Sequence, residues 1–450
     1  MAIGFLREVF REHVNDAAVI HEDRAWTFAE LDAAIEAAGA RLRGMGIPAG
    51  AVVALEADFA PQSIAYLFAL IEHAAIVVPL APTSEARKPE LVEIAQIEHA
   101  IRLPPGDTEA VIEPTGRRAD HPLFARLRKA GHPGLVLFTS GYTGEPKGAL
   151  HDCERLLTKY RTRRHRLRTL VFLLFDHIGG IDTLFQALSN GAAVIVPHDR
   201  TPESVCAAIE RHRAEVLPAS PSFLTLFLLS EAHRGHDLSS LRFITYGAEA
   251  MPQGTLTRLT EAFPGVTLLQ KYGLIELGTL RSHSRSNDSL WVKVGGEGFR
   301  TRVVDGKLQI RADSSMLGYL NAPSPFTEDG WFRTDDAVET DGEYLRILGR
   351  ASDLINVGGR KVYPPEVESV IQEVENVREA AVSGERHPFL GQIVVAQVSL
   401  ERNENVREVE RRVRDHCRSR LEPYKVPVKV SVSSGPLHSE RQKTLRRAPA

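Results

Sequence analysis

Short apolar runs separated by segments of helical period recur through most of the chain. Residues 51–55 and 75–80 are such runs, and residues 61–72 between them have the length and pattern of a helix. The same alternation continues at residues 135–138, 170–175, 192–196, 215–218, 241–246 and 266–269. Strands that alternate with helices typically form parallel sheets covered by helices. We therefore expect an α/β fold for the N-terminal part of the chain.

The pattern changes after about residue 298. Alternating residues surround Asp305 and Gly306, and a second Asp-Gly pair precedes residues 344–348, which favours antiparallel hairpins and a small β-barrel. Beyond a boundary at residues 350–353, helices are expected at 365–374 and 405–420, with strands at 378–382, 392–400 and 428–433. We predict a large N-terminal domain, residues 1–350, and a small α+β domain, residues 351–450.

Composition is ordinary for a globular enzyme, with 43% hydrophobic and 25% charged residues in a chain of 450. The net charge of −3 argues against a nucleic-acid partner. Three scattered cysteines fit a reducing compartment. Charged residues precede any long apolar run, and Glu72 and His73 interrupt the longest apolar region, so we expect neither a signal peptide nor a membrane span. A cytoplasmic enzyme is the resulting prediction.

Residues 135–149 place a loop rich in hydroxyls and glycines directly after an apolar strand. Such a loop offers successive backbone N–H donors, which form a nest for phosphate oxygens. It is not a Walker A loop, because Pro146 precedes the lysine and Gly148 follows it. The candidates for phosphate contact are Thr139, Ser140, Gly141, Tyr142, Thr143, Gly144 and Lys147.

This loop resembles the signature Ser/Thr-Ser-Gly-Ser/Thr-Thr-Gly-x-Pro-Lys-Gly of the adenylate-forming superfamily. That superfamily includes acyl-CoA synthetases, aryl-acid and amino-acid adenylating domains, and luciferases. Every position agrees except Tyr142. The resemblance covers nearly the whole chain, although residues 83–134 are shorter and more polar than in usual members. It implies an acetyl-CoA synthetase-like fold whose small C-terminal domain is mobile.

A second motif, at residues 269–276, is similar to the family's Tyr-Gly-x-Thr-Glu, with Ile275 in place of the threonine. The resemblance implies that Tyr272, followed by Gly273, packs on adenine and that Glu276 is a magnesium ligand. A carboxylate at a strand end beside a phosphate loop suits Mg²⁺, which binds one or two carboxylates together with phosphates.

Two further segments resemble the family's adenine and ribose contacts. Residues 330–336 are similar to Gly-Trp-x-x-Thr-Gly-Asp, with Asp335 in place of the second glycine, and Arg350 follows at the family's spacing. Asp336 is expected to accept the ribose hydroxyls, with Arg350 bridging ribose and phosphate. Gly247, Ala248 and Glu249 resemble the family's adenine-contact loop, in which small residues let a flat base lie against the backbone.

The resemblance also assigns roles to the C-terminal part. Ser352 and Asp353 occupy the hinge, and Gly358 and Gly359 would let a phosphopantetheine arm pass close to the backbone. Lys443 matches the family's catalytic lysine, which bridges the attacking carboxylate and the α-phosphate, although Gln442 replaces the preceding glycine.

The acid-binding segment leaves two alternatives open. Residues 175–180 resemble the family's Phe-His-x-Gly-Gly acyl pocket, and they also resemble the Phe-Asp of amino-acid adenylating domains, whose aspartate binds the substrate ammonium. An aspartate bonded to backbone is the simpler interpretation. The expected pocket residues are Asp176, His177, Gly179 and Gly180.

The resemblance implies ATP-dependent activation of a carboxylic acid, with Mg²⁺, to an acyl-adenylate and pyrophosphate. Transfer to a thiol would follow, with CoA as acceptor in a fatty or aryl acid ligase. An alternative is an amino- or aryl-acid adenylating enzyme that loads the phosphopantetheine of a separate carrier protein. A further alternative is a nucleotide-binding scaffold without turnover. The basic residues at 159–168 would meet CoA or carrier phosphates, or form a solvated face.

Overall fold

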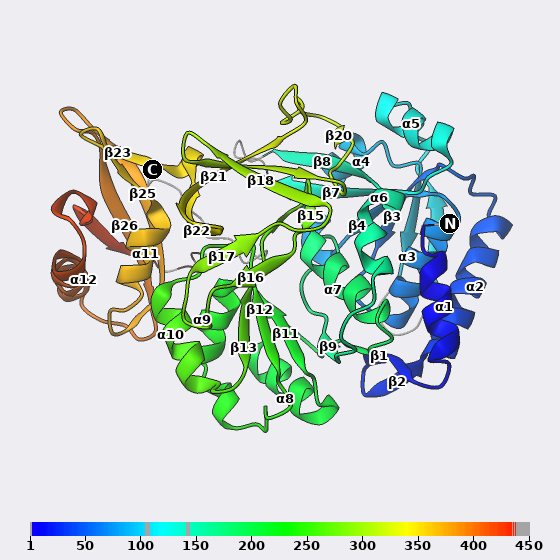
Figure 1. Cartoon of the computed structure of the whole chain (residues 1–450), viewed down its shortest axis with the longest axis horizontal. Helices are drawn as coiled ribbons and strands as arrows, with labels where there is room; N and C mark the ends of the chain where they lie inside the picture. Colours follow the sequence, from blue (N-terminus) through cyan, green and yellow to red (C-terminus); the bar gives the residue numbers. More distant parts are fainter. Residues whose placement is uncertain (1, 104–108, 141–144, 434, 436, 438–450) are drawn as a thin grey trace.

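The structure is a computed structural model that describes residues 2–103, 109–140, 145–433, 435 and 437. Two largely parallel sheets form the body of the large N-terminal part (Figure 1), which confirms the predicted fold class. The first sheet has the order β13-β12-β11-β9-β10-β1-β2. Its strands are β1 (Ala17–His21), β2 (Arg24–Thr27), β9 (Thr169–Leu170), β10 (Val194–Ile195), β11 (Val216–Ala219), β12 (Phe243–Tyr246) and β13 (Thr267–Gln270).

The second sheet carries the phosphate-loop segment and has the order β20-β8-β7-β4-β3-β5-β6. Its strands are β3 (Val52–Glu56), β4 (Ile76–Leu80), β5 (His99–Arg102), β6 (Val111–Pro114), β7 (Gly134–Ser140), β8 (Pro146–Asp152) and β20 (Gly318–Tyr319). Every residue of β4 is buried, as expected for a strand covered on both faces. β7 and β8 pair antiparallel, so the loop between them closes a hairpin.

Helices cover these sheets, and local sequence signals explain several helix ends. The helices are α1 (Gly4–Glu12), α2 (Phe28–Gly44), α3 (Pro61–Glu72), α4 (Lys88–Ile94), α5 (Pro122–Ala130), α6 (Cys153–Leu156), α7 (Ile178–Leu188), α8 (Pro202–His212), α9 (Pro221–Leu229) and α10 (Gln253–Ala262). Thr27 and Glu30 form a capping box at the start of α2. Gly131 ends α5 in the left-handed region, which glycine adopts at little cost.

An antiparallel sheet lies where the small barrel was predicted, with the order β16-β17-β22-β21-β19-β18. Its strands are β16 (Ser282–Ser284), β17 (Trp291–Val294), β18 (Phe299–Val304), β19 (Lys307–Ala312), β21 (Phe332–Asp341) and β22 (Tyr344–Arg350). The predicted Asp305-Gly306 turn joins β18 and β19. A short hairpin of β14 (Gly273–Leu274) and β15 (Gly278–Thr279) connects this sheet to β13.

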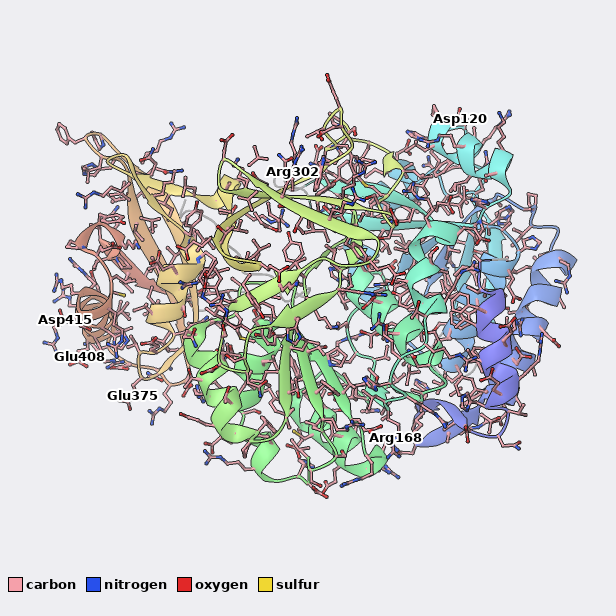
Figure 2. All side chains as sticks on the ribbon, in the orientation of Figure 1. Asp120, Arg168, Arg302, Glu375, Glu408 and Asp415 are labelled. Carbon is pink, nitrogen blue, oxygen red and sulfur yellow. The ribbon has the colours of Figure 1, made fainter. Side chains whose placement is uncertain are left out.

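The C-terminal elements lie at one end of the molecule, coloured orange and red in Figure 1, and have a hydrophobic core of their own. They are β23 (Ile355–Val357), β24 (Arg360–Val362), α11 (Pro364–Ile371), β25 (Val377–His387), β26 (Gly391–Leu400), α12 (Val406–Arg420) and β27 (Lys429–Val432). Val409, Val413 and Cys417, spaced by one helical turn, bury one face of α12. Figure 2 shows charged side chains at the periphery, including Glu408 and Asp415 on the opposite face.

Two predicted strands differ most in length from the observed ones. β25 continues to His387, because it forms a long hairpin with β26. β9 ends at Leu170, whereas a strand was expected at 170–175. The carbonyl oxygen of Phe172 instead accepts a hydrogen bond from Arg200 Nε at 2.7 Å, so the chain leaves the ladder there.

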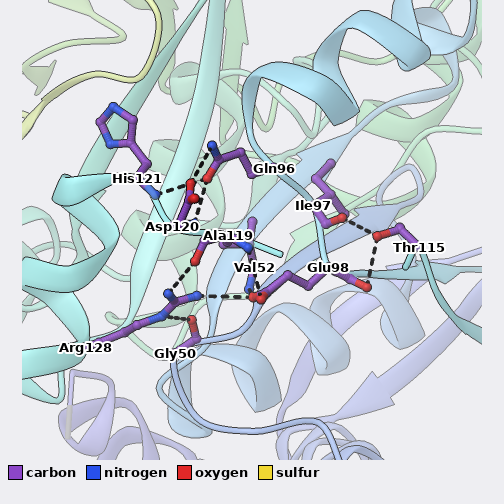
Figure 3. A network of polar contacts seen from close by, with 10 residues as sticks. All are labelled: Gly50, Val52, Gln96, Ile97, Glu98, Thr115, Ala119, Asp120, His121 and Arg128. Atoms are coloured by element: carbon purple, nitrogen blue, oxygen red, sulfur yellow. Dashed lines mark hydrogen bonds and ion pairs between the residues drawn. The ribbon is translucent and has the colours of Figure 1, made fainter. Parts of the chain in front are cut away.

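The short segment between β4 and β7 is held by a polar network on Glu98 (Figure 3). The Glu98 carboxylate accepts backbone N–H bonds from Val52 at 3.0 Å and Ala119 at 3.2 Å, and it pairs with Arg128 at 3.2 Å. Arg128 in turn donates to the carbonyl oxygens of Gly50 and Ala119. Side-chain bonds to backbone therefore fix the positions of the short elements in this segment relative to one another.

Candidate active site

A cleft of about 360 Å³ lies between the large N-terminal part and the C-terminal elements. Its walls come from α9, the loop after β12, the end of β13, the facing ends of β21 and β22, α11 and the start of β25. The cleft therefore collects strand ends from two sheets of the large part, where polar side chains and loop backbone are available to a ligand.

Asp336 is the centre of the polar groups in this cleft. The Tyr272 hydroxyl donates to Asp336 Oδ2, and Arg350 Nε lies 3.0 Å from Oδ1. The register of β21 and β22 sets Asp336 directly opposite Arg350, which explains the spacing seen in the sequence. The backbone N–H of Asp336 also donates to Thr334 Oγ1 at 3.1 Å.

Burial is the largest influence on the pKa values of Asp336 and Tyr272. It raises the pKa of Asp336, and the Arg350 guanidinium and the Tyr272 hydroxyl oppose that shift by stabilising the carboxylate. Burial also raises the pKa of Tyr272 well above its usual range, so the hydroxyl keeps its proton and remains a donor. A carboxylate has room for about four hydrogen bonds, so Asp336 retains acceptor capacity for a ligand.

Glu276 is buried, and Tyr319 contacts both its carboxylate and Lys147 of the β7–β8 hairpin. The Tyr319 hydroxyl donates to Glu276 Oε1 at 2.5 Å, and Lys147 Nζ lies 5.6 Å from the centre of the Tyr319 ring. Tyr319 sits on β20 opposite Ala149 of β8. Sequence reasoning missed Tyr319, because its distance along the chain from both partners leaves no spacing signal.

The backbone next to Glu276 is fixed by His151, which sequence reasoning also missed. His151 is fully buried on β8, and its Nε2 lies 2.7 Å from the carbonyl oxygen of Ile275. Burial lowers the pKa of His151 to about 4, so the ring is neutral and Nε2–H is the donor. The Ile275 side chain is buried in the main hydrophobic cluster, which gives the replaced threonine position a packing role.

The structure describes only part of the predicted phosphate loop and tail. Thr139 and Lys147 face each other across the β7–β8 ladder, at the base of the hairpin. Gly141, Tyr142, Thr143, Gly144 and Lys443 lie outside the described residues. The backbone N–H of Leu437 donates to Glu379 Oε2 at 2.8 Å, and Glu379 lines the cleft.

Close backbone packing accounts for two glycines beside the cleft. A Cβ on Gly247 would lie 2.6 Å from the Lys271 carbonyl oxygen, and one on Gly273 would lie 2.9 Å from Thr279 Cα. Both contacts exclude a side chain. Ala248, in the left-handed region at φ 71°, and Glu249, which accepts a backbone N–H bond from Ser222, also line the cleft.

The predicted acyl-pocket residues gather at the start of α7. Asp176 accepts a hydrogen bond from Ser84 Oγ at 2.6 Å. His177 caps α7, with Nδ1 accepting from the Gly179 backbone at 3.2 Å. A Cβ on Gly180 would lie 2.2 Å from the Leu174 carbonyl oxygen. The described residues that line the cleft do not include these four.

The hinge segment is tied to Asp335. The backbone N–H of Ser352 donates to Asp335 Oδ2 at 3.1 Å, and Lys307 Nζ lies 3.4 Å from Oδ1. Asp335 adopts φ 62°, a left-handed conformation that explains why the family has glycine at this position. Asp353 ends the short 3₁₀ turn that follows.

Gly358 and Gly359 form the turn between β23 and β24, and Gly359 borders a separate hollow near Leu390. They do not line the cleft between the two parts of the described chain.

The basic run at residues 159–168 is largely paired, which favours a solvated face over a phosphate site. Its ion pairs are Lys159–Asp182, Arg161–Glu154, Arg163–Glu12 and Arg166–Asp16. Figure 2 shows Arg168 at the molecular surface. Within the described ranges, no cluster of three or more His, Cys, Asp or Glu side chains is arranged to hold a metal, and no helix has the length and apolar character to cross a bilayer.

A magnesium ion bound partly by a nucleotide does not need such a cluster. Glu276 supplies one carboxylate from the turn between β14 and β15, and the bond from Tyr319 leaves lone pairs for a ligand. Because Mg²⁺ is usually held by one or two protein carboxylates with phosphates and water, the residues present fit this ion.

Comparisons with known proteins agree with this geometry. Residues 6–320 match a family described as AMP-binding enzyme, and residues 366–439 match its AMP-binding enzyme C-terminal domain. An indoleacetate–CoA ligase of Aromatoleum aromaticum is 28% identical over 85% of this chain and 84% of that protein. A 2-succinylbenzoate–CoA ligase of Listeria monocytogenes is 26% identical over 95% of both chains.

Solved structures show the same fold. The o-succinylbenzoate CoA synthetase of Bacillus subtilis, in complex with its acyl-adenylate intermediate, superposes with a TM-score of 0.81 at 24% identity, covering 98% of this chain and 96% of that one. The anthranilate CoA ligase AuaEII with anthranoyl-AMP gives a TM-score of 0.81 at 21% identity, covering 99% and 95%.

Proposed function

The chain belongs to the AMP-binding enzyme family, and from this premise we propose that it is an AMP-forming acid–CoA ligase. The enzyme activates a small carboxylic acid with ATP and then transfers the acyl group to the thiol of CoA. The observation that carries the proposal is the buried Asp336 in the cleft, held between Tyr272 and Arg350. The names of the relatives, ligases of indoleacetate, 2-succinylbenzoate and long-chain fatty acids, support CoA as the acceptor.

In the first step, a carboxylate oxygen of the acid attacks the α-phosphorus of ATP. The new P–O bond gives the acyl-adenylate, and the bond to the β-phosphate breaks to release pyrophosphate. Ionised Asp336 accepts the ribose hydroxyls, and Arg350 lies beside it to meet ribose and phosphate. The loop from Thr139 to Lys147 holds the departing pyrophosphate through backbone N–H groups and the lysine charge.

Charge develops on phosphoryl oxygens during this attack, so positioned cations lower the barrier. Glu276 would hold Mg²⁺, which would supply positive charge to neutralise the phosphates. Lys443 bridges the attacking carboxylate and the α-phosphate. Leu437, six residues before it, is bonded to Glu379 in the cleft wall, which supports a tail that reaches the reacting groups.

In the second step, the small domain turns about Ser352 and brings the Gly358–Gly359 turn to the cleft. The CoA thiolate attacks the acyl carbon, a thioester forms, and the bond to AMP breaks. In this structure α11 and β25 line the cleft, and the Gly358–Gly359 turn does not. This arrangement is suited to the first step. The ATP and CoA consumed, together with the buried free cysteines Cys153, Cys206 and Cys417, support a cytoplasmic location.

The test measures AMP and pyrophosphate release for fatty, aryl and amino acids, with CoA, a phosphopantetheine carrier or hydroxylamine as acceptor. Release that depends on the acid, with a thioester formed on CoA, is expected. Thioester on the carrier alone would favour the carrier-loading alternative. ATP binding without turnover on any acid would favour the scaffold.

The role of Lys443 can be separated from binding. Lys443→Ala should slow adenylation by about 10²–10³-fold, the scale for losing one positioned charge-stabilising donor. Thiol transfer from synthetic acyl-AMP should stay nearly unchanged. Lys429→Ala, an exposed lysine of the same domain paired with Glu385, is the matched control. Equal damage to both steps by Lys443→Ala would contradict the role.

A further inference from the structure

Lys271 directly follows β13 and is one of the residues that line the cleft. Its backbone N–H donates to the Tyr246 carbonyl oxygen at 2.7 Å, which extends the pairing of β12 and β13 by one residue. Lys271 lines the cleft and is only partly exposed. The family motif gives a role to its neighbour Tyr272 and none to this lysine.

Successive side chains of an extended segment point to opposite sides. The Tyr272 side chain reaches Asp336, which places the nucleotide on its side. The Lys271 ammonium instead lies in the field of Asp182 on α7, Lys159 and Arg164. It therefore faces α7, the helix whose first turn was expected to border the acid.

The one carboxylate acting on Lys271 is already occupied. Asp182 Oδ1 accepts from Lys159 Nζ and from the Tyr160 hydroxyl, the latter at 2.6 Å. Lys159 also donates to the Thr279 carbonyl oxygen at 2.8 Å. Within the described part of the chain, the Lys271 ammonium has neither a hydrogen bond nor an ion pair, and Lys159 and Arg164 add positive charge around it.

An ammonium withdrawn from water is costly unless a partner compensates it. Burial lowers the pKa of Lys271, which is the expected sign of that cost. A purely structural lysine would pair with Asp182, and here Lys159 holds that position. Because Asp182 already accepts from Lys159 and Tyr160, it compensates the Lys271 charge only in part, and an anion that arrives with the substrate would complete the compensation.

We propose that Lys271 binds a second carboxylate of the acid, remote from the one that is activated, so that the preferred substrates are dicarboxylic acids. This inference rests on the proposed function and narrows its substrate class. An amino acid fits poorly, because its ammonium would meet the Lys271 charge.

The first experiment compares matched acids on the unaltered enzyme. Acid-dependent pyrophosphate release is measured for succinate against butanoate, glutarate against pentanoate, adipate against hexanoate, and phthalate against benzoate. For the best pair, kcat/KM for the diacid should exceed that for the monoacid by about 10²-fold or more, the scale of one buried charge pair. Monoacids preferred throughout would overturn the proposal and leave the ligase function standing. No turnover with any acid would instead count against the proposed function.

Variants then assign the preference to the residue. Lys271→Met should remove about 10²-fold of kcat/KM for the best diacid, mainly through KM, and leave its monoacid partner unchanged or improved. Lys271→Arg should keep the diacid preference. Lys293→Met, an exposed lysine paired with Glu343, is the control and should behave as the unaltered enzyme. Equal losses on diacid and monoacid in Lys271→Met would overturn the assignment.

Thermal unfolding separates recognition from a structural role. Replacing an unpaired, partly buried ammonium by an apolar side chain of similar length should leave the midpoint of Lys271→Met unchanged or higher. A clear drop in that midpoint would show that the lysine stabilises the fold, and would count against a role in binding the acid.

Discussion

His151 should make the large domain lose stability as the pH falls through the ordinary range of histidine. The ring is fully buried on β8 and is neutral, with Nε2 donating to the Ile275 carbonyl oxygen. Nδ1 makes no hydrogen bond among the described residues, and although the Ser314 backbone would favour the charged ring, burial opposes a proton there more strongly. Folding therefore favours the neutral ring, and burial lowers the pKa of His151 from 6.5 to about 4.

The sign and size of the effect follow from proton linkage. Below the unfolded pKa of 6.5, the unfolded chain binds a proton at His151 that the folded chain excludes until the pH approaches 4. The stabilisation is thus complete above that unfolded pKa and is lost between the two values. At about 1.4 kcal/mol per pH unit, the free energy of unfolding should fall by about 2 kcal/mol between pH ~6.5 and pH ~5 from this residue alone.

His151→Gln isolates the effect, because its amide can still donate to Ile275 and does not titrate. Urea unfolding is followed by tryptophan fluorescence, which reports on the N-terminal part that holds His151, since Trp26, Trp291 and Trp331 all lie before β22. The quantity of interest is the difference in unfolding free energy between the two proteins at each pH. Subtraction removes other groups that titrate equally in both.

The stability advantage of the unaltered protein should shrink by about 2 kcal/mol over the window from pH ~6.5 to ~5. His283→Gln, which changes an exposed histidine on β16, should show no such change. A difference for His151→Gln that stays constant with pH would refute the argument, since it would mean that the buried ring does not resist protonation.

Three further substitutions probe the site. Asp336→Asn should raise the KM for ATP by about 10²-fold. Burial raises the pKa of Asp336, and only the carboxylate accepts ribose hydroxyls, so the ATP affinity measured by calorimetry should begin to fall at a pH above the usual carboxyl range. The Asp336→Asn variant should not show this pH-dependent fall in affinity. Tyr319→Phe removes the donor to Glu276 and should cost about 10-fold in magnesium affinity, read by magnesium titration of pyrophosphate release; an unchanged titration would contradict it. Asp335→Gly suits the left-handed backbone but removes the acceptor of the Ser352 N–H. The rate of thiol transfer from acyl-AMP should therefore change, while the free energy of unfolding shifts by no more than about 1 kcal/mol.

The sequence was most informative where residues act through local spacing. The alternation of apolar runs and helical segments predicted the α/β fold, and the Asp305-Gly306 pair predicted a hairpin that the structure contains. Asp336 and Arg350 were predicted together, and the register of β21 and β22 supplies the reason. These features depend on turn chemistry and on a hairpin period, which short stretches of sequence carry.

Contacts made across long chain separations were missed. Tyr319 reaches Glu276 only because β20 pairs with β8, and His151 reaches Ile275 only because β8 passes beneath that segment. Neither residue differs by itself from an ordinary buried tyrosine or histidine. Their roles follow from sheet pairing, which no local pattern encodes. The same holds for Lys271, whose isolation is visible only when Asp182 is seen to be occupied.

The departures from the family motifs are better explained by specialisation than by loss of activity. Ile275 contributes to the core, and the Asp335 carboxylate accepts a hydrogen bond from the Ser352 backbone, so each replacement has a contact of its own. In a protein that had lost turnover, buried charged residues would be replaced first, because they destabilise the fold when no ligand compensates them. Here Asp336 and Glu276 remain buried with dedicated donors, and the partly buried Lys271 ammonium has no hydrogen bond or ion pair among the residues that the structure describes. Such an arrangement persists when a charged substrate compensates it, and this favours turnover over a nucleotide-binding scaffold.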